Sequence, residues 1–285
     1  MKASENTYQI RGQTWNCFES GSGHPILFLH NGGGTLQNWA HQLEHFSSTH
    51  RVIAPDLPGF GRSHRPNEPL TLDTYVSGLS ELLNKLNCPN PILVGNCIGS
   101  AIALEFALHN PEKVRALALF NICGGIPMLN PRLQFWAGLR PRTGFGKAIH
   151  KFMIDAARHP NFQSLNENLI YANGEPKLHP MLEQFVSQQR HDPRLRASLY
   201  WLVMGLESFN VFSQPRQRPI NFPPTMLGWG KENNTLAPKW ASMIAKWLKP
   251  DELLLLEDAG HMPMYEQPEI VNEKLEMFIH SLPRA

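Results

Sequence analysis

The residues 95–99 read Gly-Asn-Cys-Ile-Gly and place one thiol, that of Cys97, between two glycines. An apolar run at residues 91–94 precedes them, and a helix-favouring stretch at 100–108 follows. A strand, a sharp turn and a helix are the context in which a G-x-S-x-G pattern exposes a nucleophile at the tip of the turn. Glycines on either side relieve crowding at such a strained turn. The pattern therefore predicts that Cys97 is a nucleophile, with a small buried apolar residue as the alternative.

A histidine late in the chain supplies the proton chemistry that a thiol nucleophile needs. His261 lies in the sequence Ala-Gly-His-Met-Pro at residues 259–263. An imidazole within hydrogen-bond reach of Cys97 would take the thiol proton and later return it to the leaving group. The alternative is a surface histidine on a loop.

Strand and helix patterns alternate along most of the chain, which predicts a mainly parallel sheet with helices on both faces. A hairpin-like region ends at residues 19–23, and two apolar helical patterns cover residues 72–86 and 268–282. Thr71 is the expected start signal of the first helix. The expected strands are residues 26–29, 51–54, 92–94, 115–120, 225–228 and 252–256.

The alternation stops between about residues 125 and 224, where no convincing strand is found. This segment holds twelve Lys and Arg but six Asp and Glu, a balance of +6, which leaves −4 for the rest of a chain of net charge +2. We expect a helical cap at 125–224 inserted into a core formed by residues 1–124 and 225–285.

Four segments together resemble the α/β-hydrolase superfamily, and the resemblance covers nearly the whole chain outside the expected cap. It implies the α/β-hydrolase fold, with an eight-stranded, mainly parallel sheet. Residues 29–34 resemble the oxyanion loop of the family, with Asn31 in place of its usual first glycine. Residues 56–63 resemble its D-x-P-G-x-G-x-S turn, in which Asp56 is expected to form the turn rather than to catalyse. The other two segments are residues 95–99 and the histidine segment that begins at Ala259.

The resemblance implies a role for each matched residue. Cys97 at the start of a helix would be stabilised as thiolate by the positive helix end, which predicts a lowered pKa and selective alkylation near pH 6.5. The backbone N–H groups of Ile98 and of Gly32 or Gly33 would hold the oxyanion.

The third catalytic position departs from the family, which has an acid after the penultimate strand. Counting forward from Gly230 places Asn233 there, and counting back from Pro238 places Asn234 there. An amide can orient an imidazole, and cysteine tolerates the missing carboxylate better than serine because the thiol is already acidic. Glu232 is the alternative acid.

Further residues are expected at the pocket. Asn31, Cys123, Trp136 and Trp201 are candidates to line it, and pockets of this kind are mainly apolar. Cys123 follows the strand at 115–120 and would lie at the same sheet edge as Cys97. It could line the pocket, form an oxidisable pair with Cys97, or pack in the core.

Composition limits the remaining possibilities. A chain of 285 residues with 42% hydrophobic and 18% charged residues is globular, and a net charge of +2 gives no case for nucleic acid. The start shows no apolar leader, and no stretch reaches the length of a membrane span, so we expect a cytoplasmic protein without membrane contact. The four cysteines have neither C-x-x-C nor zinc spacing, so we expect no metal and no cofactor.

The predicted function is an acyl hydrolase that acts on an ester or thioester through an acyl-Cys97 intermediate. The acyl substrate would be a small molecule, either free or linked to coenzyme A or an acyl-carrier protein, because the basic cap suits an anionic handle. Two alternatives are an acyltransferase to an amine, alcohol or thiol, and a non-catalytic binding protein on the same fold. An engineered replacement of serine at position 97 is also compatible with the sequence.

Overall fold

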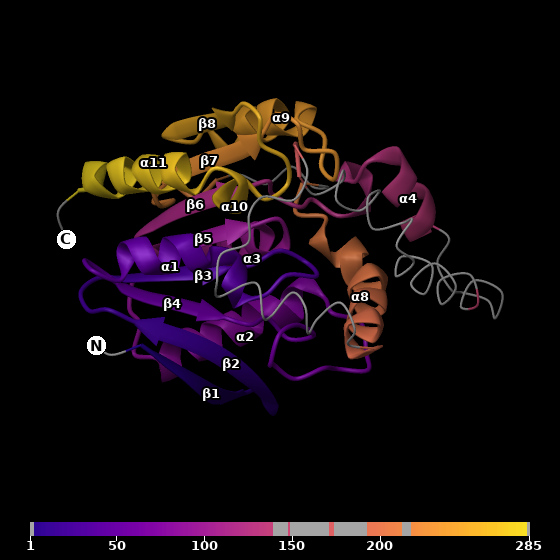
Figure 1. Cartoon of the computed structure of the whole chain (residues 1–285), viewed down its shortest axis with the longest axis horizontal. Coiled ribbons are helices and arrows are strands. Elements are labelled where there is room, and N and C mark those ends of the chain that lie inside the picture. Colours follow the sequence, from indigo (N-terminus) through magenta and orange to yellow (C-terminus); the bar gives the residue numbers. More distant parts are fainter. Residues whose placement is uncertain (1–2, 139–147, 149–170, 174–192, 213–217, 284–285) are drawn as a thin grey trace.

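The computed structural model describes residues 3–138, 148, 171–173, 193–212 and 218–283. Their strands form one eight-stranded sheet in the order β1-β2-β4-β3-β5-β6-β7-β8 (Figure 1). β1 pairs with β2 and β2 with β4 in antiparallel fashion, and all other neighbours are parallel. The predicted α/β-hydrolase-type sheet is confirmed.

The strands lie close to the predicted positions, with ends that move by a residue or two, and the N-terminal hairpin is present. The strands are β1 Ser4–Ile10, β2 Gln13–Ser20, β3 Pro25–Leu29, β4 Arg51–Pro55, β5 Ile92–Asn96, β6 Ala116–Phe120, β7 Thr225–Gly230 and β8 Glu252–Leu256.

The helices of the described residues include the two that periodicity predicts, α2 and α11. Thr71 caps α2 as expected, because its hydroxyl accepts a hydrogen bond from the Thr74 N–H at 3.2 Å. The helices are α1 Ala40–Phe46, α2 Leu72–Lys85, α3 Ile98–His109, α4 Pro131–Gly138, α8 Pro193–Gly205, α9 Lys239–Leu248, α10 Pro263–Glu266 and α11 Pro268–Ser281. None of them is both long and apolar enough to cross a membrane.

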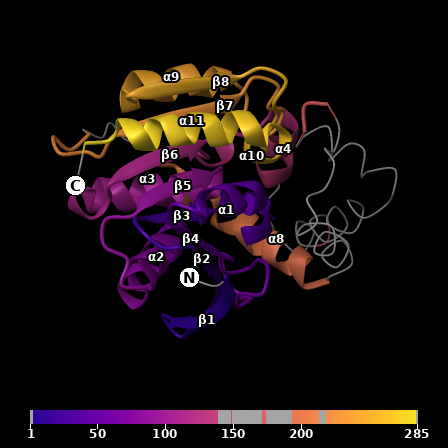
Figure 2. The same ribbon diagram turned by 60° about the vertical axis from the view of Figure 1, so that its left-hand side comes forward.

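Strand residues alternate between two apolar layers because successive side chains point to opposite faces of the sheet. In β3, Ile26 and Phe28 join one layer, and Leu27 and Leu29 join the other. The first layer lies under α1 and α11, which cross the front of the sheet in Figure 2, and the second packs against α2, α3 and α9. The sheet is therefore buried on both faces, and its carboxyl ends remain as the place for a site.

The described part of the expected cap adds no strand to the sheet. It contributes α4 and α8, which lie on the right of Figure 1. The side chains of Leu199 and Leu202 on α8 lie over the loop after β3, because a Cβ built on Gly33 would be 3.4 Å from Leu199 and one on Gly32 would be 2.6 Å from Leu202. Most of residues 139–217 lies outside the described residues, so a helical cap bounded by residues 125 and 224 stays a prediction.

Candidate active site

Cys97 stands at the turn between β5 and α3 in a conformation that a side chain rarely adopts. Its φ is 55° and its ψ is −111°. The flanking glycines are required by close backbone contact. A Cβ on Gly95 would lie 2.5 Å from the Ser100 nitrogen, and a Cβ on Gly99 would lie 2.1 Å from the Leu29 oxygen. The backbone is thus strained at Cys97, and the turn holds the thiol at the carboxyl edge of the sheet.

Two backbone donors converge on the Cys97 sulfur. The N–H groups of Ile98 and Gly32 both hydrogen-bond it, and their effect is to lower the pKa of the thiol. These are two of the three donors that the sequence singles out for an oxyanion hole. Gly33, the third, has a φ of +80° in the same loop. Asn31 is buried beside them, and its Oδ1 accepts a hydrogen bond from Asn38 Nδ2 at 2.9 Å.

The expectation of a lowered pKa at Cys97 is wrong. The pKa of Cys97 lies well above its ordinary value, because its side chain hydrogen-bonds to Cys123 and because the site is buried. The same bond lowers the pKa of Cys123. The Cys123 N–H also donates to the Cys97 carbonyl at 3.2 Å. Burial and the second thiol outweigh the helix end and the two backbone donors, so Cys97 rests as a neutral thiol, and the expected selective alkylation near pH 6.5 loses its basis.

His261 lies on the loop between β8 and α10, with 4% of its surface exposed. Its carbonyl accepts hydrogen bonds from Asn96 Nδ2 at 3.0 Å and from Asn121 Nδ2 at 3.2 Å. Asn96 immediately precedes Cys97, so the histidine backbone is tied to the turn that carries the thiol. Burial lowers the pKa of His261 to about 4, and the imidazole is neutral at pH 7.

Asn121, which the sequence analysis missed, joins three parts of the site. Besides the His261 carbonyl, its Nδ2 bonds the Asn96 Oδ1 at 3.1 Å, and its Oδ1 accepts from the Gly230 N–H at 3.3 Å. Glu266, which belongs to the segment that resembles the histidine segment of the family, accepts from the N–H groups of Gly260 and Met262, each at 3.0 Å. The only local signal was that Asn121 follows a predicted strand at the edge where the site was expected.

The two candidate asparagines differ in environment. Asn233 is 2% exposed, and its Oδ1 accepts from the N–H groups of Thr235 at 3.0 Å and Leu236 at 2.9 Å. Asn234 is exposed. Glu232 is exposed as well, and its carboxylate accepts from the Ala259 N–H at 3.0 Å. Of these three side chains, that of Asn233 is the one buried at the edge where His261 lies.

The tryptophan candidates are only partly placed. Trp201 on α8 is half-buried, packs against the apolar layer that contains Cys97, and forms an edge-on contact with Tyr200 at 4.9 Å between ring centres. The side chain of Trp136 lies outside the described residues.

A second histidine, His30, is buried in the loop after β3 with both ring nitrogens engaged. Its Nδ1 lies 2.7 Å from the Asn31 carbonyl, and its Nε2 accepts from the Leu57 N–H at 2.9 Å. The neutral ring satisfies both contacts, since Nδ1–H donates and Nε2 accepts. Burial lowers the pKa of His30 to about 4.

We expect the stability that neutral His30 contributes to be lost in mild acid. The unfolded chain takes up this proton near pH 6.5, whereas the folded chain stays uncharged down to about pH 4. The contribution is therefore complete above pH 6.5 and falls by about 3 kcal/mol as the pH drops to 4.

Urea unfolding of wild type and the His30→Gln variant at several pH values measures this loss. The difference between the two free energies of unfolding should shrink by about 3 kcal/mol between pH 7 and pH 4. A difference that stays constant over this range would contradict the assignment of a neutral, buried His30.

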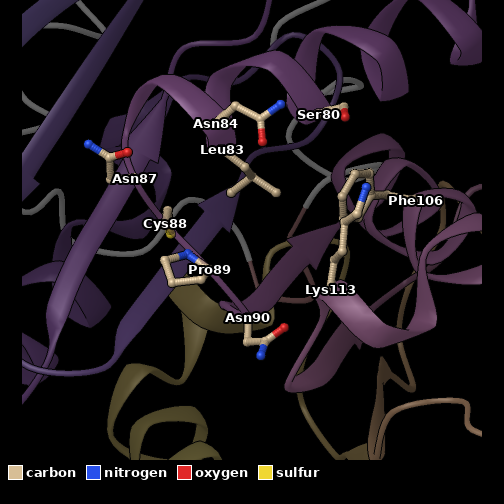
Figure 3. Close-up of a pocket in the computed structure, with 9 residues that line it drawn as sticks. All are labelled: Ser80, Leu83, Asn84, Asn87, Cys88, Pro89, Asn90, Phe106 and Lys113. Atoms are coloured by element: carbon tan, nitrogen blue, oxygen red, sulfur yellow. The ribbon is translucent and has the colours of Figure 1, made fainter.

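A shallow pocket of about 510 Å³ lies away from Cys97, near the amino end of β5 (Figure 3). Its wall includes Cys88, Asn90, Phe106 and Lys113. None of the predicted site residues lines it. No cluster of His, Cys, Asp and Glu among the described residues could hold a metal ion.

The sheet order, the turn at Cys97 and the histidine after the last strand define an α/β-hydrolase fold, and comparison with known proteins agrees. The family model for the alpha/beta hydrolase fold matches residues 24–268, and the chain belongs to this family.

Curated relatives of the chain include several hydrolases. The chain is 34% identical over 257 residues to 2-hydroxy-6-oxo-2,4-heptadienoate hydrolase of Pseudomonas putida. This alignment covers 88% of this chain and 87% of the relative. It is 25% identical to Lipase 1 of Psychrobacter immobilis, over 86% of this chain and 73% of the lipase. Among solved structures, a thermophilic esterase from Thermogutta terrifontis superimposes with a TM-score of 0.72 at 20% identity, over 98% of each chain, and shows the shared fold.

Proposed function

We propose that the protein is an acyl hydrolase that cleaves an ester or thioester through an acyl-Cys97 intermediate, with His261 as the general base. The observation that carries the proposal is the convergence of the Ile98 and Gly32 N–H groups on the Cys97 sulfur. An acyl carbonyl attacked by that sulfur would place its oxygen near the same two donors. In acyl-transfer enzymes each such donor contributes roughly 3 kcal/mol to transition-state stabilisation.

The reaction has two halves. The Cys97 sulfur attacks the carbonyl carbon while its proton passes to His261, and the bond to the leaving group breaks as that group takes the proton. A water molecule then gives a proton to His261 and attacks the thioester. The carboxylic acid leaves, and the proton returns to the Cys97 sulfur.

The relatives support ester hydrolysis and suggest the substrate class. Among them are a lipase and a hydrolase of a 2-hydroxy-6-oxo-dienoate, so the substrates to test first are small neutral esters and that dienoate. Leu199 and Leu202 of α8 place apolar groups above the oxyanion loop, which suits an apolar acyl chain. An acyl group carried on coenzyme A or an acyl-carrier protein remains a proposal that rests on the +6 balance of residues 125–224.

Intact-mass spectrometry tests the covalent step. After incubation with a p-nitrophenyl ester or an acyl-coenzyme A, we expect the mass to increase by one acyl group, located on Cys97 by peptide mapping. The adduct should be absent from Cys97→Ala and present in Cys88→Ala, which removes a buried thiol outside the site. If no substrate modifies Cys97 and no turnover is measured, the non-catalytic binding protein becomes the better interpretation.

Added nucleophiles separate hydrolysis from acyl transfer. A thioester intermediate reacts more readily with amines and thiols than an oxyester does. A hydrolase should release the free acid at a rate that added amine, alcohol or thiol leaves nearly unchanged, whereas a transferase should give the amide, ester or thioester as main product.

A further inference from the structure

Two neighbouring strands end beside each other at the site and bring two thiols together. β5 and β6 pair in parallel as far as Asn96 and Phe120 (Figure 1). Hydrogen bonds continue past the ends of the strands. The Cys97 N–H donates to the Phe120 carbonyl at 3.0 Å, and the Cys123 N–H donates to the Cys97 carbonyl at 3.2 Å. The backbones of Cys97 and Cys123 are therefore direct neighbours.

The side chains of these two cysteines also face each other, because their thiols are hydrogen-bonded. A disulfide needs Cα atoms that are close and Cβ atoms that point toward each other. The backbone hydrogen bond provides the first condition, and the contact between the thiols provides the second. Both thiols are free in this structure.

The surroundings of the pair favour reaction with a small oxidant. The Cys97 thiol and the Gly125 N–H hydrogen-bond the Cys123 sulfur and lower the pKa of Cys123 against the opposing effect of burial. The first proton of the pair therefore leaves from Cys123, and its thiolate accepts the S–H of Cys97. Cys97 is 8% exposed and Cys123 is 1% exposed, so an oxidant that enters the site meets the Cys97 sulfur first.

We propose that Cys97 and Cys123 form a reversible disulfide when the protein meets a hydroperoxide, and that this bond protects Cys97 from irreversible oxidation. Formation of the disulfide does not depend on the proposed function. The accompanying loss of activity rests on it, because a sulfur in a disulfide cannot attack an acyl carbonyl.

The reaction with hydrogen peroxide takes two steps. The Cys97 sulfur attacks one peroxide oxygen and passes its proton to the Cys123 thiolate, while the O–O bond breaks and hydroxide leaves. Cys97 is then a sulfenic acid. The Cys123 sulfur attacks the Cys97 sulfur, the S–O bond breaks, and the released hydroxide takes the Cys123 proton as water. Two electrons pass from the two sulfurs to the peroxide.

The other two cysteines lack this arrangement. Burial raises the pKa of Cys17 well above its ordinary value and the pKa of Cys88 to about 12. The Cys17 thiol contacts a backbone oxygen, that of Phe18, at 3.8 Å. Because peroxides react with thiolates, we expect both cysteines to stay reduced under conditions that oxidise the pair.

Peptide mapping tests the disulfide without any substrate. Cys88 and Cys97 share the tryptic peptide of residues 86–113, so the experiment uses Cys88→Ala, in which that peptide has a single thiol. The protein is treated with a small excess of hydrogen peroxide, unfolded in iodoacetamide and digested without reductant. We expect a species about 2 Da lighter than the sum of peptides 86–113 and 116–132, which dithiothreitol separates again.

Cys17 should be fully alkylated in the same sample. The same linked peptides from the wild type, with Cys88 alkylated, check that the substitution did not create the bond. Sulfinic acid at Cys97 with Cys123 still alkylated would overturn the proposal, and so would a bond from Cys97 to Cys17 or to a second chain.

Recovery of esterase activity tests the protection of Cys97. After peroxide and then dithiothreitol, the wild type should regain more than about 80% of its starting activity toward a p-nitrophenyl ester. Cys123→Ser should regain less than about 20% of its own, because a sulfenic acid without a second thiol proceeds to sulfinic acid, which dithiothreitol does not reduce. Cys123→Ala serves as the second variant. Equal recovery in wild type and variants would refute the protective role.

The two measurements keep the proposals separate. A linked peptide in a protein that turns over no ester would refute the proposed function and leave the disulfide standing. An active enzyme in which peroxide produces no linked peptide would refute the disulfide and leave the proposed function standing.

Discussion

Cys97→Ser is expected to lower kcat/KM for a small ester by about 10³-fold or more, although serine is the usual nucleophile of this turn. A serine hydroxyl depends on a general base, whereas a thiol is several pKa units more acidic and depends on it less. An asparagine at position 233 supplies no carboxylate to stabilise the imidazolium that forms when His261 takes the serine proton.

The double variant Cys97→Ser, Asn233→Asp should recover most of that loss, because serine, histidine and a carboxylate then form an ordinary triad. Steady-state kinetics of the four proteins give the coupling between positions 97 and 233. If Asn233→Asp has the same effect with cysteine and with serine, the two positions act independently, and the interpretation of cysteine and asparagine as one paired adaptation fails.

Asp56→Asn is expected to lower the free energy of unfolding by about 3 to 5 kcal/mol. The buried carboxylate accepts from the Leu36 N–H at 2.9 Å, from the Arg62 N–H at 2.9 Å and from Asn16 Nδ2 at 3.0 Å. An amide provides one accepting atom, so at least one of these donors would face an NH₂ group.

Urea unfolding at pH 7 measures this loss, and Asp73→Asn serves as the control. Asp73 lies in the first turn of α2, where removing an exposed charge should cost below about 1 kcal/mol. We infer that the hydrogen bonds of Asp56 stabilise the turn at residues 56–63. Equal losses of unfolding free energy in the two variants would contradict this inference.

The sequence was sufficient for the fold and for the identity of the turn at Cys97, because both depend on local patterns. The strand at residues 252–256 was predicted to the residue, since a run of four leucines with polar residues on both sides defines it. The helices α1 and α9 were not predicted individually. α1 has seven residues, and a helix this short forms against its neighbours and leaves a weak periodic signal. α9 does carry a clear apolar face, with Ala241, Ile244 and Leu248 buried, and this pattern could have predicted it.

The electrostatics of the site could not be obtained from the sequence. The position of Cys97 at the start of α3 predicted a lowered pKa for its thiol. The contact with Cys123 raises that pKa instead, and this contact depends on where β6 ends beside β5 in the folded sheet. Counting residues from Gly230 and from Pro238 likewise left Asn233 and Asn234 as equal candidates for the third catalytic position. In the structure Asn233 is buried and its side chain accepts from two backbone N–H groups, whereas Asn234 is exposed. Asn121 was missed because an asparagine after a strand does not by itself indicate a functional residue. Its role becomes visible only from its hydrogen-bond partners in the folded structure.

The amide cluster of Asn96, Asn121 and the His261 carbonyl has an evolutionary consequence. It connects the three loops of the site through backbone atoms and through two buried asparagine side chains. The residues at 97 and 233 can then be exchanged by mutation without moving the loops that carry them. A lineage with this framework can pass between serine and cysteine, and between aspartate and asparagine, by single substitutions that preserve the folded state while the chemistry is being reselected.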